Sequence, residues 1–158
     1  SKIFTSADIP AEVLDLMIVN TKTLKQNPAL GKALTGAWYE VMDIMSGKGP
    51  KTDKALTYMA KSAECSLADY KAQLKTTAMF YKAKDAVKFA EGANIKKKMD
   101  FVRLFCFSHG LLGENAKSVD VVGIQYPDGS IAGNKKKPTF RFDVSYMKMA
   151  AEGKLKLK

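Results

Sequence analysis

The distribution of apolar residues predicts a buried strand close to the start of the chain. In the stretch IPAEVLDLMIVN, residues 13–19 are almost continuously apolar, which is typical of a parallel strand covered on both faces. Proline follows Ile9 and favours an extended approach to the strand, because the residue before a proline avoids the helical region. The stretch also contains Glu12 and Asp15, although carboxylates are rarely found in a protein core.

The longest predicted helix follows this strand. Asn27 and Pro28 are a favourable N-cap and first helical residue, and the glycines of SGKGP (residues 46–50) end the helix. Between these signals, apolar residues recur at the i, i+3, i+4 spacing of one helical face. This stripe consists of Leu30, Ala33, Leu34, Ala37, Trp38, Val41, Met42 and Met45.

Further helices are predicted by the same criteria at residues 52–64, from Ser66 onward, and at residues 84–91 and 94–109. Ser66 opens the sequence SLAD, which resembles a capping box. TTAMFY (residues 76–81) interrupts the helical spacing. In the helix at 94–109, one face carries Ile95, Met99, Val102, Cys106 and His109.

The apolar period then changes from that of a helix to that of a strand. Residues 121–126 and 130–132 flank the turn sequence PDGS and predict a β-hairpin. TFRFD (residues 139–143) alternates like a further short strand, and residues 145–152 predict a closing amphipathic helix. The fold class is therefore α/β and helix-rich, with one buried strand, about six helices and a small hairpin. The buried strand lacks obvious sheet partners in this inventory.

Composition narrows the possible functions. The apolar and charged fractions, 46% and 27%, are those of an ordinary folded domain. No apolar run approaches the roughly 20 residues of a membrane-spanning helix, so we expect no membrane insertion. The net charge of +10 suggests nucleic-acid binding, but the lysines are spread along the chain and no aromatic-interleaved basic motif accompanies them. We therefore expect a solvated basic surface and no nucleic-acid partner.

No arrangement of residues predicts catalysis or metal binding. The sequence has neither a GxSxG nucleophile motif nor a phosphate loop, and Glu12 and Asp15 would point to opposite faces of a strand. Cys106 and His109 could begin a zinc site, but no further ligands have suitable spacing, so His109 more simply satisfies helix-terminal carbonyls. We expect no enzyme activity, no cofactor and no metal.

Two pairs of residues leave alternatives open. Cys65 and Cys106 could form a disulfide worth about 4 kcal/mol in an oxidising compartment, or remain small buried thiols in a reducing one. Phe80 and Tyr81 lie at a predicted break between helices, where they could either pack in the core or contact a ligand.

An ordered series of segments resembles one protein family. IPAEVLDLMIVNTKTLKQNPALGKALTGAWYEVM, LKTTAMFY, MDFVRLFCFSHGLLGE and FDVSYMKMAAEGKL are similar to the C-terminal half of bacterial ABC-transporter solute-binding proteins. The likeness covers residues 9–155. The family is the nitrate/sulfonate/taurine type, and the nearest branch is the urea- or guanidine-type one. The pattern departs at Ala11, where relatives often have glycine, and at Lys82 and Lys84, in a region that is commonly less basic.

The resemblance implies a type II periplasmic binding fold, in which two lobes joined by crossover strands close around a small solute. Residues 1–12 would form a hinge or crossover segment, residues 13–113 the strand and helical part of the first lobe, and residues 114–158 the hairpin and C-terminal helix of one partial domain. The partners would be an ABC permease and the N-terminal half of the same protein, or a second copy. The localisation would be periplasmic.

The same resemblance suggests which residues face the solute. They are Ser6, Asp8 and Glu12 at the hinge, with Phe80 and Tyr81 as an apolar wall. A single wall cannot enclose a ligand, so we expect these 158 residues to bind solute weakly by themselves and to expose an apolar patch. The alternative is a stand-alone basic helical interaction domain that binds an acidic partner or nucleic acid, with strongly salt-dependent affinity.

Overall fold

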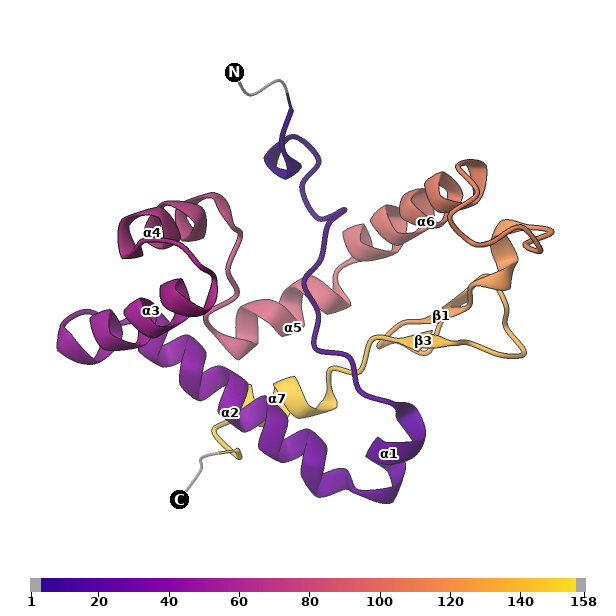
Figure 1. Ribbon diagram of the computed structural model, residues 1–158. Coiled ribbons are helices and arrows are strands. Elements are labelled where there is room, and N and C mark those ends of the chain that lie inside the picture. Colours follow the sequence, from indigo (N-terminus) through magenta and orange to yellow (C-terminus); the bar gives the residue numbers. More distant parts are fainter. Residues whose placement is uncertain (1–3, 156–158) are drawn as a thin grey trace. The chain divides into compact units, whose positions relative to one another are not determined.

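The computed structural model describes residues 4–155, which form a helix-rich chain of the broad α/β class (Figure 1). Seven α-helices and one three-stranded sheet lie within this range. The chain divides into two compact units. Unit 1 contains the residues up to Leu16 together with Val87–Ser145, and unit 2 contains Met17–Ala86 together with the residues from Tyr146 onward. Residues 1–3 of the predicted hinge and residues 156–158 of the predicted C-terminal segment lie outside the described residues.

Unit 2 is built from helices, and all but the first of them were predicted from the sequence. They are α1 (Thr21–Gln26), α2 (Pro28–Ser46), α3 (Pro50–Ser62), α4 (Leu67–Thr76), the first part of α5 (Ala83–Glu91) and most of α7 (Ser145–Ala151). Pro28 is the first residue of α2, as predicted, and the Ser66 hydroxyl caps α4 by accepting the Asp69 amide at 3.1 Å. α3 packs on both α2 and α4 (Figure 1).

The buried face of α2 differs from the predicted apolar stripe. Its buried positions are Gly31, Thr35, Gly36 and Met42, whereas Trp38 and Val41 of the stripe are exposed. Small residues are required because neighbours come close: a Cβ atom on Gly31 would lie 2.5 Å from the Tyr146 ring. The space beside Gly31 is filled by the side chains of Tyr146 and Leu24, so this part of the covered face of α2 needs a residue without a side chain.

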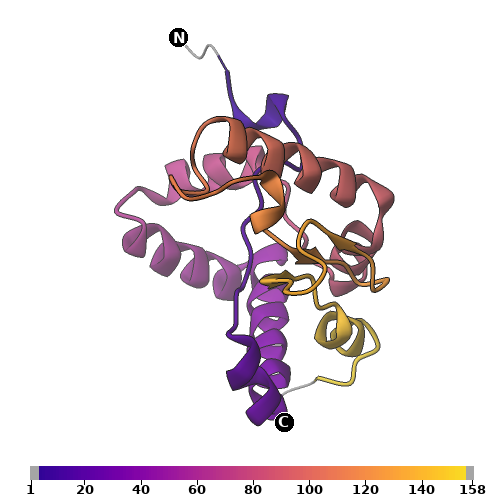
Figure 2. The same ribbon diagram turned by 90° about the vertical axis from the view of Figure 1, so that its right-hand side faces the viewer.

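Unit 1 combines α6 (Ala93–Ser108) with a small sheet of strand order β2-β1-β3. β1 (Ile124–Gln125) pairs antiparallel with β2 (Ile131–Ala132), which confirms the predicted hairpin, and parallel with β3 (Phe140–Arg141), which confirms the third strand. Ile95 and Met99 of α6 pack with Ile124 and Tyr126 in the core of the unit. Figure 2 shows α6 running beside this sheet.

The prediction of a buried strand at residues 13–19 is wrong, because the structure has no strand there. Residues 14–20 have no regular secondary structure and are drawn as a tube between the 3-10 helix η1 (Ser6–Asp8) and α1 in Figure 1. Val13 and Ile18 are 66% and 74% exposed, and Leu16 and Met17 are also exposed. A β-strand needs neighbours for its backbone N–H and C=O groups, and none of the strands in the described residues pairs with this segment.

Two further features of the described residues are the character of the helices and the state of the cysteines. Of the helices in residues 4–155, none combines the length and the apolar character needed to cross a membrane. Cys65 and Cys106 are both free thiols, and they belong to different units. The division of the chain at residues 12 and 113 and the two-lobe fold stay predictions.

Candidate functional site

Ser6 and Asp8, two of the predicted solute-facing residues, lie in the short 3-10 helix η1 (Ser6–Asp8). The Asp8 carboxylate accepts hydrogen bonds from the Thr5 amide at 2.7 Å and the Thr5 hydroxyl at 3.2 Å. The Thr5 hydroxyl in turn accepts the Ala7 amide, which completes a capping box. Asp8 therefore has a local role in holding η1, while Ser6 is exposed to solvent.

Glu12 forms the most protected ion pair of this region. Its carboxylate lies 2.6 Å from the Nζ atom of Lys98 on α6, and the two side chains are 14% and 27% exposed. Partial burial makes such a pair stronger than one in open solvent, because water screens it less. The pair joins the N-terminal segment of unit 1 to α6, across 86 residues of sequence.

The backbone at Ala11 sets the position of Glu12. Ala11 has a φ angle of +66°, in the left-handed region, inside a turn in which the Glu12 amide donates to the Ile9 carbonyl at 3.3 Å. Glycine adopts this conformation freely, whereas a residue with a Cβ atom does so at a penalty of roughly 1 kcal/mol. Ala11 therefore keeps the turn at an energetic penalty that glycine would not pay.

Phe80 and Tyr81 lie in the loop between α4 and α5, where both are half-buried. They belong to unit 2, whereas Ser6, Asp8 and Glu12 belong to unit 1. Of the five predicted residues, the structure thus groups three on the N-terminal segment and two on a separate loop. Within unit 1 it adds Lys98, which the sequence analysis did not single out.

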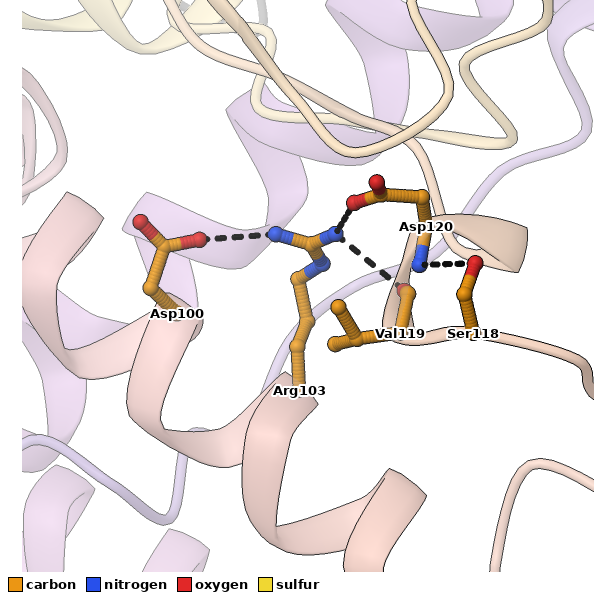
Figure 3. A network of polar contacts seen from close by, with 5 residues as sticks. All are labelled: Asp100, Arg103, Ser118, Val119 and Asp120. Atoms are coloured by element: carbon orange, nitrogen blue, oxygen red, sulfur yellow. Dashed lines mark hydrogen bonds and ion pairs between the residues drawn. The ribbon is translucent and has the colours of Figure 1, made fainter.

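A second polar cluster in unit 1 surrounds Arg103, whose side chain is only 9% exposed (Figure 3). Its guanidinium donates to Asp100 at 2.8 Å, to Asp120 at 3.0 Å and to the Val119 carbonyl at 3.2 Å. These bonds fasten η2 (Val119–Val121) to α6. The arrangement is that of a structural anchor, because the donors at the ends of the guanidinium are already bound to protein oxygens.

Tyr126 is the buried neighbour of this cluster. Its hydroxyl and the Nε atom of Arg103 are buried without a hydrogen-bond partner among the described residues. Burial raises the pKa of the Tyr126 phenol, the Asp100 charge raises it further, and the Arg103 charge lowers it. The net effect is a raised pKa, so the Tyr126 phenol stays neutral to a higher pH than an exposed tyrosine does.

The lysine run at residues 96–98 is partly used within unit 1. Lys96 forms an ion pair with Asp128 in the hairpin turn, and Lys98 pairs with Glu12. The Lys96 ammonium, helped by hydrogen bonds from Ser130, holds the pKa of the Asp128 carboxyl far below its usual range. Lys97 is exposed.

No set of three or more His, Cys, Asp or Glu side chains within residues 4–155 is arranged to hold a metal ion. His109 is the C-cap of α6, and its Nδ1 atom lies 2.9 Å from the Phe105 carbonyl oxygen. Since a carbonyl only accepts, Nδ1 carries the proton in this contact. The helix-terminal role predicted for His109 is confirmed.

Comparison of the chain with protein-family models, with curated protein sequences and with solved structures finds no match. We take the Glu12–Lys98 pair, with the turn that carries it, as the candidate site, because it is a part-buried pair of opposite charges that includes one of the predicted residues. A part-buried carboxylate beside an ammonium group can exchange its partner for a charged or hydrogen-bonding solute.

Proposed function

We propose that this chain is part of the substrate-binding component of an ABC importer in the bacterial periplasm. It captures a small polar solute of the urea/guanidine, sulfonate or nitrate type between two lobes of a type II binding fold and delivers it to the permease. No covalent bond is made or broken; affinity follows from closure of the lobes around the solute. The proposal rests on the ordered segments that resemble this family and on the Glu12–Lys98 pair.

The Glu12–Lys98 pair is the observation that carries the proposal. Glu12 lies on the N-terminal segment that the resemblance assigns to the solute cleft, and with Lys98 of α6 it supplies one charge of each sign. A guanidinium or urea N–H group could replace Lys98 at the Glu12 carboxylate. A sulfonate or nitrate oxygen could instead replace Glu12 at the Lys98 ammonium. The two charges therefore distinguish the two solute classes.

The extended segment at residues 14–20 supports the expected protein partner. Apolar side chains of Leu16, Met17 and Ile18 are exposed along it, and its backbone pairs with none of the strands described. An extended, apolar segment of this kind is suited to adding to the edge of a sheet. We propose that the N-terminal half of the same protein, or a second copy, supplies that sheet.

The Glu12→Gln and Lys98→Gln variants test the proposal. Isothermal titration at high protein concentration would compare guanidine, urea, nitrate and taurine with the unchanged chain. For a guanidine-type solute we expect Glu12→Gln to abolish binding and Lys98→Gln, which removes a competing cation, to strengthen it. For an anionic solute we expect the opposite pattern. Lys96→Gln and Asp128→Asn, which break the neighbouring Lys96–Asp128 pair, are the matched controls.

Binding by the 158 residues alone should lie in the millimolar range or weaker, on the order of −4 kcal/mol, because one wall of a cleft leaves the solute hydrated. Micromolar binding by this chain would contradict a two-lobe site. If Glu12→Gln and Lys98→Gln bind every solute with the same affinity as the two control variants, Glu12 and Lys98 do not contact the solute.

A further inference from the structure

Unit 2 contains a groove of about 520 Å³ between the end of α2, the start of α3 and the second half of α4. We call it the α3 groove. Its apolar wall consists of Met45, Leu56 and Leu74, and three lysines, Lys48, Lys71 and Lys75, also line it. A volume of roughly 300–1,000 Å³ with a mainly apolar lining and a few charged groups is characteristic of sites for small ligands.

The groove has an excess of positive charge. Lys71 Nζ lies 2.8 Å from Asp53 Oδ1, so these two charges neutralise each other. Lys48 and Lys75 form no ion pair with any residue in the part of the chain that the structure describes. Three lysines and one aspartate line the α3 groove, which leaves a net charge of +2.

The walls of the α3 groove are held in place by packing within unit 2. α3 packs on α2 and on α4 (Figure 1). The Thr52 hydroxyl is buried and donates to the Ile44 carbonyl at 2.8 Å, which ties the first turn of α3 to the last turn of α2. Because the helices are fixed by their own contacts, the ordering needed for binding is that of exposed side chains such as Lys48 and Lys75 and not of the helices.

From the apolar wall and the unpaired lysines we infer that the α3 groove binds a small organic anion. The ligand has a short apolar body, which contacts Met45, Leu56 and Leu74, and a carboxylate, sulfonate or phosphate group, which Lys48 and Lys75 bind through charge-assisted hydrogen bonds. None of the predicted solute-facing residues lines this groove. The site is therefore separate from the Glu12–Lys98 pair and does not depend on the transport function.

Titration of the ¹⁵N-labelled chain with butanesulfonate, followed by amide chemical shifts, tests this inference. Gly47 and Gly49 line the groove and serve as reporters. The double variant Lys48→Gln/Lys75→Gln should weaken binding about tenfold or more, since it removes two charge-assisted contacts. Lys22→Gln/Lys25→Gln on α1 removes the same charge from the same unit, outside the groove, and should leave binding unchanged.

Butanol and butylammonium separate the apolar contribution from the charge contribution. We expect both to bind much more weakly than butanesulfonate, and we expect added salt to weaken butanesulfonate binding. Equal weakening by the two double variants would overturn the inference, because it would reduce the effect to net charge. Binding of butanol as tight as that of butanesulfonate, or shifts confined to residues outside the groove, would also overturn it.

Discussion

Replacement of Gly133 by alanine should destabilise unit 1 much more than the same replacement at Gly129. The two glycines flank β2, and both have positive φ angles, +69° at Gly133 and +83° at Gly129. Alanine therefore meets a similar backbone penalty at both positions, roughly 1 kcal/mol. The surroundings differ, and this difference isolates the effect of the packing around Gly133.

A Cβ atom on Gly133 would lie 2.0 Å from the Val122 carbonyl oxygen and 2.3 Å from Nη2 of Arg103. A Cβ atom on Gly129 would have no heavy atom within 4 Å. Relief of the clash requires the backbone and the Arg103 side chain to move, and overpacking of this kind costs about 1–3 kcal/mol. We therefore expect a loss of about 2–4 kcal/mol for Gly133→Ala and about 1 kcal/mol for Gly129→Ala.

Peptide-resolved hydrogen exchange is the suitable assay, because a chain with two compact units need not unfold in a single step. Peptides from α6 and β1 should exchange faster in Gly133→Ala. Trp38, the only tryptophan of the sequence, lies in unit 2, so its fluorescence in urea controls for changes outside unit 1. Equal exchange in the two variants would refute the reasoning, since it would mean that neither the Val122 carbonyl nor Arg103 packs against Gly133.

Two further predictions concern Ala11 and Tyr126. Ala11→Gly should raise the free energy of unfolding by up to about 1 kcal/mol, because glycine removes the penalty of the left-handed turn; a lower urea midpoint would contradict the assigned conformation. Tyr126→Phe should not reduce stability at neutral pH, because it removes a buried hydroxyl that has no hydrogen-bond partner in the described residues. The raised pKa of Tyr126 keeps the phenol protonated in the folded state, whereas the unfolded phenol ionises near its usual pKa of about 10. The contribution of Tyr126 to the free energy of unfolding should therefore be fully present below that pH and fall as the pH rises through the folded pKa. In urea titrations, Tyr126→Phe should show a smaller alkaline loss than the unchanged chain, and the raised pKa of Tyr39 contributes equally to both.

Elements with local signals were predictable from the sequence. The start of α2 at Pro28, the cap of α4 at Ser66 and the hairpin around PDGS follow from residues that are neighbours in the chain. α1 was missed although Asn20 caps it by accepting the amides of Lys22 and Thr23. Its six residues contain one large apolar side chain, Leu24, so no periodic stripe marks the helix.

Features that depend on distant residues were not predictable. The apolar run at residues 13–19 has the composition of a strand, but pairing requires a neighbouring strand, and composition carries no information about it. The partner of Glu12 is 86 residues away, so the Glu12–Lys98 pair has no local signature. The burial of Arg103, in contrast, has a local signature. Arg103 continues the four-residue spacing of Ile95 and Met99, which indicates the buried face of α6.

The ion pairs of Lys96 and Lys98 affect how the basic character of this protein should be probed. In sequence, the run at residues 96–98 is an obvious target for charge neutralisation in a test of polyanion binding. In the structure, two of its three ammonium groups hold the hairpin turn and the N-terminal segment against α6. Neutralising the whole run would cut both ion pairs, and weaker binding could then result from a loosened unit 1. Lys97→Gln alone changes the surface charge of this run and leaves both ion pairs in place.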